Sequence, residues 1–192
     1  MTKGRLEAFS DGMIAVFITS MVLELKIPHG SDLSALRQIG PTFCTYVLSY
    51  VFLGIYWNNH HHLLHAADRV NGKILWANLH LLFWLSLVPF TTGWMGENRL
   101  ASLPTAIYGT VLLLAAVAWV VLQRAIIALQ GPESPLARAL GKDAKAKISL
   151  ALYCLAIPLS FIRGWIAAAL YVVVALIWLV PDRRIESRLG QE

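Results

Sequence analysis

Two groups of side chains in this sequence are suited to chemistry. The first group, Arg5, Ser10 and Asp11, opens an apolar stretch at about residues 9–27. An ionisable side chain at the edge of a hydrocarbon layer costs free energy unless it is paired or solvated, so such residues are candidates for a functional site. The second group is the run from Tyr56 to His65, which holds four histidines.

The histidines have the chemistry of metal ligands or of groups that change charge near neutral pH. His61 and His65 are four residues apart and share one face of a helix, but no HExxH motif and no acidic third ligand accompany them. We therefore expect no metal and no cofactor, and interpret the histidines as members of a pH-sensitive hydrogen-bond network. No nucleophile–base pair or carboxylate cluster stands out, so the sequence does not predict an enzyme.

The elements that position these groups are membrane helices. The chain has 192 residues, of which 57% are hydrophobic and 14% charged, more apolar surface than a soluble domain of this length can bury. A membrane-crossing helix needs roughly 20 apolar residues. We predict an all-α, polytopic membrane protein, a single domain over 1–192 with six spans at about 9–27, 43–64, 74–95, 105–127, 148–162 and 165–180.

Several local features refine this prediction. The last two spans are short, and Arg163 and Gly164 divide them in a turn at the membrane surface. Pro89 and Pro158 lie inside or near the end of a span, where each is expected to kink its helix. The two cysteines, Cys44 and Cys154, fall within spans, and we expect them to be buried thiols without a disulfide.

The basic residues indicate the orientation of the chain. Under the six-span arrangement, 12 of the 16 lysines and arginines fall on the side of the two termini. The positive-inside rule then places both termini in the cytoplasm, for a protein of the plasma membrane. The positive net charge is thus a topology signal and not a sign of nucleic-acid binding. Membrane lipids are expected partners, and one basic cluster suits anionic headgroups: Arg138, Lys142, Lys145 and Lys147.

The first span also carries a candidate pore lining. At about 100° per residue, one narrow stripe holds Gly12, Val16, Ser20, Leu23 and Ile27, with Thr19 at its edge. Hydrophobic rings and hydroxyl rings are the two ingredients of a channel constriction, if several copies of the stripe meet on an axis. The alternative is that the small residues only allow close helix packing. Further out, Glu24 and Lys26 either bias cations at the mouth or snorkel to the interface.

The cytoplasmic ends of the first three spans bring polar residues to one depth. Arg5, Ser10 and Asp11 come from span 1, Trp57, His60 and His61 from span 2, and Asn78 from span 3. Because unpaired polar groups are costly at this depth, we expect these side chains to form one hydrogen-bond network.

At these residues the sequence resembles the transmembrane protein 175 family, the prokaryotic relatives of the lysosomal potassium channel. The resemblance covers about residues 4–95, and the last three spans match only in hydropathy and order. It rests on Arg5 with Phe9-Ser10-Asp11, Tyr56-Trp57 with His60-His61, and Asn78 with Leu87 and Pro89-Phe90.

The resemblance implies a homotetramer of six-span subunits that forms a potassium-preferring cation channel without a TVGYG filter. The first helix of each subunit would line the pore, with constriction layers at Val16, Ser20 and Leu23 and a hydroxyl layer at Thr19. The family usually has a larger Ile or Leu at the first layer and often Leu at the second, so Val16 and Ser20 imply a wider or wetter constriction. Arg5 and the Phe9-Ser10-Asp11 signature would tie span 1 to spans 2 and 3.

The alternative function is a proton-coupled ion transporter that uses Asp11 and the histidines as a relay. Such a transporter needs a titratable path through the bilayer, and spans 4–6 offer no acidic or histidine residue at mid-depth. Potassium conduction is therefore the leading prediction, with potassium ions and other copies of the chain as partners.

Overall fold

The computed structural model describes residues 2–140 and 144–179, and within them all regular secondary structure is helical. The all-α prediction is confirmed. Position 180, at the end of the sixth predicted span, lies outside the described residues, as does the basic tail that follows position 180. Lys142 of the predicted basic cluster also lies outside them. The helices are α1 (Lys3–Leu23), α2 (Leu33–Gln38), α3 (Gly40–His65), α4 (Gly72–Ser86), α5 (Val88–Glu97), α6 (Ser102–Gln130), α7 (Pro135–Leu140), α8 (Ala144–Ser160) and α9 (Gly164–Leu179).

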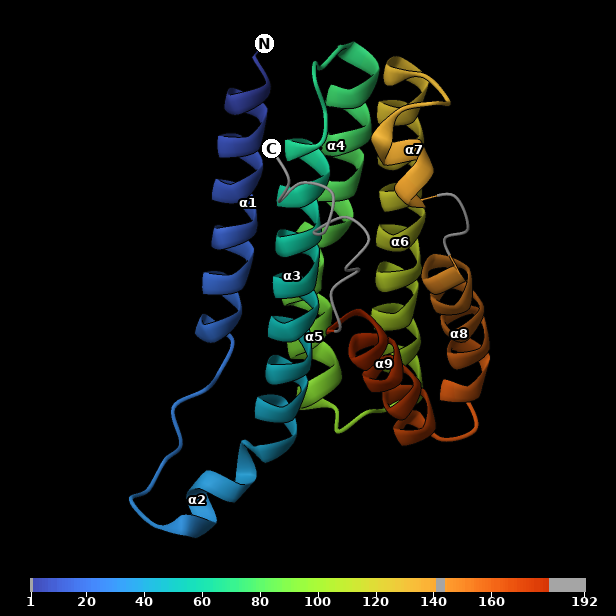
Figure 1. The fold of residues 1–192 in the computed structure, drawn as a ribbon. Coiled ribbons are helices and arrows are strands. Elements are labelled where there is room, and N and C mark those ends of the chain that lie inside the picture. The colour runs from blue at the N-terminus through green and yellow to red at the C-terminus, as the bar shows by residue number, and fades with distance from the viewer. Residues whose placement is uncertain (1, 141–143, 180–192) are drawn as a thin grey trace.

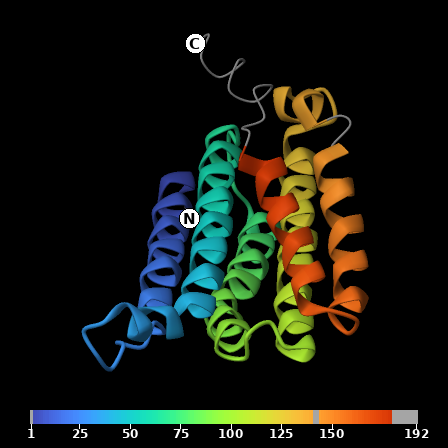
Figure 2. The same ribbon diagram turned by 90° about the horizontal axis from the view of Figure 1, so that it is seen from below.

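The long helices stand side by side, and α1 lies at one edge of the bundle (Figures 1 and 2). α1 packs against α3, α4 and α5, whereas α6 packs against α4, α5, α8 and α9. The start of α1, the α3–α4 connection and α7 lie at one end of the bundle, and α2, the α5–α6 loop and the α8–α9 turn lie at the other (Figure 1). We call these the terminal end and the loop end.

Several of these helices are long and apolar enough to cross a membrane. Three stretches are long and apolar enough to cross a membrane, Lys3–Leu23, Gly72–Glu97 and Ser102–Gln130, and Gly164–Leu179 is a shorter apolar helix. α3 is 26 residues long but is not among the three. The described helices thus identify a membrane protein, while the six-span topology remains a prediction.

The first helix begins and ends earlier than the hydropathy indicates. It starts at Lys3 and ends at Leu23, with Glu24 as its C-cap. Ile27, predicted to continue the stripe at helical spacing, therefore lies in the loop that leads to α2. That loop ends where the Asp32 carboxylate accepts a hydrogen bond from the Ala35 backbone N–H and caps α2.

The third predicted span is divided into two helices near its middle. α4 ends at Ser86, Leu87 is the cap residue of both helices, and Pro89 lies in the first turn of α5. Proline has no backbone N–H to donate, so it is tolerated in the first turn of a helix but interrupts a continuous one. The proline predicted to kink this span lies at the break.

The last two helices are joined by a tight turn around Arg163. α8 ends at Ser160, two residues after Pro158, and α9 begins at Gly164 and packs back against α8. Gly164 lies against the Leu100 backbone carbonyl so closely that a Cβ atom there would overlap it. A glycine is therefore required where the α8–α9 turn meets the α5–α6 loop.

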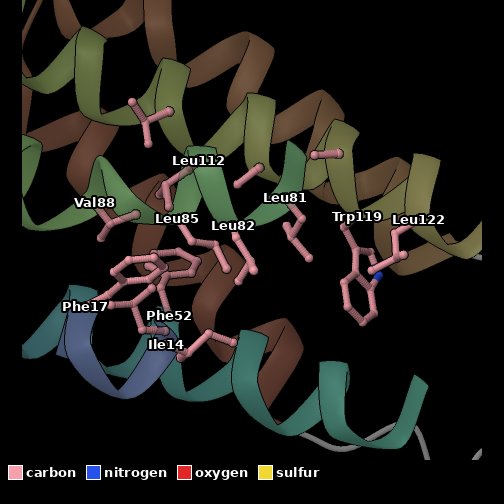
Figure 3. Packing of buried hydrophobic residues seen from close by; sticks show 14 of the residues in the cluster. Ile14, Phe17, Phe52, Leu81, Leu82, Leu85, Val88, Leu112, Trp119 and Leu122 are labelled. Carbon is pink, nitrogen blue, oxygen red and sulfur yellow. The ribbon is translucent and has the colours of Figure 1, made fainter. Parts of the chain in front are cut away.

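The core lies between α1, α3, α4 and α6 and consists largely of aliphatic side chains. Ile14 and Phe17 of α1 point toward Phe52 of α3 and Leu82 of α4 in Figure 3. All four are at most 6% exposed. One prediction about side chains is wrong: Cys44 and Cys154 are free thiols but are exposed, because both lie on outward faces of their helices.

We predict that Gly164→Ala destabilises the fold. An alanine normally stabilises a helical position relative to glycine, but here its Cβ would collide with the Leu100 carbonyl, and overpacking of this kind costs about 1–3 kcal/mol. Gly72→Ala is the matched control, because Gly72 is also the first residue of a helix and has no atom within 4 Å of a Cβ. Thermal unfolding in detergent should show a lower midpoint for Gly164→Ala only; equal midpoints would contradict the contact.

Candidate functional site

The first helix has two faces of different character. Its inward face is a narrow stripe at helical spacing that packs against α3, α4 and α5 and consists of Leu6, Ser10, Ile14, Phe17 and Met21. Met13 and Ile18 beside this stripe also pack against the core, and Lys3 and Glu7 contact the end of α3, whereas the opposite face of α1 is exposed. The candidate site is therefore built around α1, a long apolar helix with one packed face and one exposed face.

The outward face carries most of the residues predicted to line a pore. Val16 is 60% exposed and Leu23 is 83% exposed. Gly12 is also exposed, and no atom lies within 4 Å of a Cβ built there. Gly12 therefore does not serve close packing within this chain, so the packing alternative would require a second chain.

The two hydroxyl residues of the stripe bond to their own helix. The Thr19 hydroxyl donates to the Ala15 carbonyl at 2.9 Å, and the half-buried Ser20 hydroxyl donates to the Phe17 carbonyl at 3.0 Å. Each hydroxyl has one hydrogen and two acceptor lone pairs. With the hydrogens engaged in the helix, the oxygens keep lone pairs that can act as acceptors.

Ile27, the last residue predicted for the stripe, is 85% exposed in the loop after α1. It follows Glu24 and Lys26 at the loop end of the bundle. The Lys26 ammonium lies 2.7 Å from the Glu97 carboxylate at the end of α5, and this hydrogen-bonded ion pair raises the pKa of Lys26. Lys26 is thus paired with Glu97 of α5, and Glu24 lies against Gly93, which also belongs to α5.

A buried hydrogen-bond chain anchors the terminal half of α1. The Asn78 side-chain amide of α4 donates to Ser10 Oγ of α1 at 2.9 Å, and its carbonyl oxygen lies 2.6 Å from His60 Nε2 of α3. Ser10 in turn donates to the Leu6 carbonyl at 2.8 Å. All three side chains are fully buried. This Ser10–Asn78–His60 chain joins three helices through side chains from widely separated parts of the sequence.

The bonding pattern determines which nitrogen of His60 carries hydrogen. An amide oxygen is only an acceptor, so His60 Nε2 must be the donor to Asn78. The other ring nitrogen, Nδ1, is buried without a hydrogen-bond partner among the described residues, and the same holds for Asp11 Oδ1. The site therefore holds an unsatisfied histidine nitrogen and an unsatisfied carboxylate oxygen on adjacent helices.

A second layer of contacts lies nearer the terminal end. His61 Nδ1 is 3.0 Å from the Glu7 carboxylate of α1, and the His61 ring stacks on Trp57 and on His65. Lys3 donates to the His65 carbonyl at 2.7 Å. The sequence reasoning missed Glu7, although its position one turn before Asp11 puts it at the depth of the histidines.

Among the predicted members of the network, Asp11 has a buried oxygen without a partner among the described residues, and two others, Arg5 and Phe9, lie apart from it. Arg5 and Phe9 are exposed on α1, and Arg5 makes no hydrogen bond or ion pair within the described part of the chain. Both lie on the side of α1 that continues to Val16, not on the side that faces α3 and α4. Any partner of Arg5 must therefore come from outside the described chain.

A further buried polar cluster lies at mid-bundle and was not predicted. The Ser49 hydroxyl of α3 is 2.6 Å from the Thr92 hydroxyl of α5 and 2.9 Å from the Tyr108 hydroxyl of α6. These residues are single hydroxyls in apolar runs, so nothing in their spacing signals that they meet. The cluster holds α5 to α3 and α6.

The site shows no arrangement suited to a metal. Within residues 2–140 and 144–179, no three histidine, cysteine, aspartate or glutamate side chains gather closely enough to hold a metal ion. The polar cluster acts through hydrogen bonds between helices. The fold and this site together define a helical membrane protein with a polar anchor at one end of a helix that has a bare face.

Comparison with known proteins identifies the family. The family described as the endosomal/lysosomal potassium channel TMEM175 matches residues 5–89. A potassium channel of Chryseobacterium sp. (strain P1-3) is 52% identical over 191 residues, with all of both chains covered. The chain belongs to the TMEM175 family of ion channels, as the resemblance in its first three predicted spans indicates.

Two other relatives extend this result. The crystal structure of a lysosomal potassium-selective channel TMEM175 homolog from Chamaesiphon minutus matches with a TM-score of 0.81 at 27% identity, covering 94% of this chain and 97% of that chain. The human endosomal/lysosomal proton channel TMEM175 is 33% identical over 96 residues, which is 43% of this chain and 19% of the human protein. The fold is therefore shared with the Chamaesiphon minutus homolog over 94% of this chain.

We predict that Asn78→Leu destabilises the protein by about 1–3 kcal/mol, because the buried His60 N–H would lose its acceptor. Asn98→Leu is the matched control, since Asn98 bonds only to the Trp94 carbonyl in an exposed position. Thermal unfolding of the two variants should separate them clearly. In addition, Ser10→Ala should cost less in the Asn78→Leu background than alone; strictly additive losses would show that the chain of bonds does not act as a unit.

Proposed function

We propose that the protein is a potassium-preferring cation channel formed by four copies of the chain around an axis lined by α1. The observation that carries this proposal is the bare outward face of α1. Val16, Thr19 and Leu23 are exposed along it at helical spacing, and the described chain has nothing to cover them. Membership of the TMEM175 family and the names of the relatives support potassium as the ion.

A second exposed surface supports association with further copies. On α3, large side chains recur on one stripe next to α1, and each of them is at least 42% exposed: Phe43, Val47, Tyr50 and Trp57. Aromatic side chains of this kind are enriched in interfaces between chains. We propose that the α3 stripe contacts α1 of the neighbouring subunit, so that the other sides of α1 face the pore. Arg5 and Phe9 would then lie at this subunit boundary.

The proposed pore has two kinds of layer. Leu23 and Val16 would form hydrophobic rings that exclude water when they are close together. Thr19, with Ser20 beside it, would form a hydroxyl layer between them, whose oxygens replace part of the hydration shell of a potassium ion. Valine is smaller than leucine, so the Val16 ring would be the wider of the two constrictions.

The polar cluster has a supporting role in this proposal. The Ser10–Asn78–His60 chain holds α1 against α3 and α4, about two to four helical turns before the proposed constrictions. A fixed register of α1 is needed because a ring of side chains forms only if all four copies present the same residue at the same depth. We further propose six spans, both termini in the cytoplasm and residence in the plasma membrane.

We predict that Leu23→Ala and Val16→Ala each raise potassium flux, because a smaller side chain lowers the cost of hydrating the constriction. Val173→Ala is the matched control: Val173 is an exposed valine on α9, far from α1 in the sequence and in the bundle. Flux is measured in liposomes with an outward potassium gradient and a proton ionophore. Wild-type flux in all three variants would remove α1 from the pore.

The proposed ion selectivity is tested in the same liposomes. Leu23→Asn should weaken discrimination between potassium and sodium, because an amide ring hydrates both ions. Reversal potentials in paired potassium and sodium gradients measure this change. An unaltered reversal potential, with normal assembly, would exclude Leu23 as a selectivity-determining residue.

Proton coupling is the second candidate function, and one observation favours it. Asp11 Oδ1 and His60 Nδ1 are both buried without a partner among the described residues, so each keeps a lone pair that could accept a proton. Two animal relatives, which match 46% and 43% of the chain, are also named proton channels. A pH gradient without an ionophore distinguishes the candidates: transport of potassium against its gradient, lost in Asp11→Asn, would favour the transporter.

Symmetry gives an independent test of the assembly. Projection averages of the purified protein in detergent should show fourfold symmetry with α1 at the axis. A monomer, a dimer or an axis formed by α8 and α9 would overturn the proposed pore without reference to any transport assay.

A further inference from the structure

A second candidate binding site lies on the opposite side of α3 from α1. An apolar groove of about 480 Å³ runs between α3 and α9 at the loop end of the bundle. Its walls come from Cys44 and Leu48 on α3 and from Ala168 and Val172 on α9, and Met95 and Leu100 form its floor. The volume is within the roughly 300–1,000 Å³ of ligand clefts in proteins.

The groove has one charged residue at its mouth. Arg99 lines it at the turn between α5 and α6. Arg99 and Leu100 both have positive φ angles, 48° and 60°, and the Leu100 N–H donates to the Met95 carbonyl. The chain reverses direction at this turn, which places the charged Arg99 side chain next to the apolar walls.

Arg99 also lines a neighbouring hollow with Glu24, Lys26 and Glu97, and neither carboxylate forms an ion pair with Arg99. The nearest acidic residue in the sequence, Glu97, forms an ion pair with Lys26 at 2.7 Å. Arg99 is exposed and has no ion pair within the described part of the chain. An unpaired cation directly above an apolar groove is complementary to a molecule with an anionic head and a hydrocarbon tail.

The dimensions fit such a molecule. The walls extend from Pro41 and Arg99 at the mouth to Leu48 and Val172, and seven helical residues rise about 10 Å. The groove therefore penetrates inward from the membrane boundary along the direction of the helices, as an acyl chain in a bilayer does. The groove has its charged residue at the membrane boundary and its apolar walls further in, as a phospholipid has its headgroup at the boundary and its acyl chains inside.

The outer surface of α9 indicates lipid and not a second protein chain as the neighbour. Its exposed residues beside the groove are aliphatic, Val172, Val173 and Leu176, and Trp165 is exposed near its start at the loop end. Tryptophan is enriched at membrane interfaces. Protein contacts between membrane helices favour small residues or aromatic stripes such as that of α3, which faces away from this groove.

We propose that this groove binds one acyl chain of an anionic phospholipid, with the lipid phosphate against Arg99. This site is separate from the proposed pore and does not depend on which ion the protein conducts. It is also separate from the basic cluster around Arg138 and Lys145, which lies toward the terminal end.

The test uses the purified full chain with phosphatidylglycerol and phosphatidylcholine of equal chain length, and native mass spectrometry counts the retained lipids. The wild type should retain phosphatidylglycerol in preference to phosphatidylcholine. Arg99→Gln should weaken phosphatidylglycerol retention about fivefold, the effect of one basic residue at a membrane surface. Arg37→Gln, an exposed arginine at the same end but outside the groove, is the control and should retain lipid as the wild type does.

A second pair of variants tests the apolar part of the site. Val172→Trp fills the groove and should reduce retention of both lipids, whereas Leu176→Trp, on the same helix but outside the groove, should not. Equal retention by Arg99→Gln and the wild type would overturn the proposal. So would dissociation of the assembly by Val172→Trp, because the groove would then be covered by a second copy. Displacement of the lipid by inorganic phosphate alone would likewise overturn it, since only an anion would then be recognised.

Discussion

The whole arrangement depends on how α1 is held. A stripe of five buried residues is the main attachment of this helix to the bundle, and Ser10 is the polar member of that stripe. In an apolar environment a buried hydroxyl, amide or imidazole without a partner is costly, so Ser10, Asn78 and His60 must meet in one register only. Hydrophobic contacts between α1 and its neighbours would tolerate sliding or rotation by part of a turn, but the hydrogen bonds do not.

This constraint explains why the charged and polar residues, which attract attention first in the sequence, are separate from the residues proposed to face ions. Polar side chains on the inner stripe fix rotation and depth, and the outer stripe is then free to remain apolar. In a membrane protein an exposed apolar face contacts lipid unless another protein surface covers it. In a homo-oligomer the same chain supplies that surface, and the exposed α3 stripe beside α1 suits that purpose.

Much of this could be predicted from the sequence, for physical reasons. The helical class follows from the apolar composition, and the family was recognisable because its signature residues are concentrated in 4–95. Equal depth along antiparallel helices was enough to group Ser10, His60 and Asn78. However, the depth of a residue in the membrane does not specify the direction in which its side chain points around the helix axis. For that reason Arg5 and Phe9 were assigned to the same group although they lie on the outward side of α1, and the exposure of the cysteines was not foreseen.

Other features had no signal in the sequence. The Ser49–Thr92–Tyr108 cluster consists of isolated hydroxyls, and only the packing of three helices brings them together. The end of α1 at Leu23 could not be read from hydropathy, because Leu25 and Ile27 continue the apolar character beyond the helix. Glu7 precedes the apolar stretch that starts at about residue 9, so hydropathy does not place it in the membrane helix.

The break at Leu87 has a mechanical consequence. Because the third predicted span is two helices and not one rod, the two ends of α1 are attached to separate bodies. α4 holds the terminal half through Asn78, and α5 faces the other end, where Glu97 pairs with Lys26. A tilt of α5 about this joint would move the Leu23 end of α1 while the Ser10 end stayed in place. One end of α1 is thus fixed to α4, and the position of the other end follows α5.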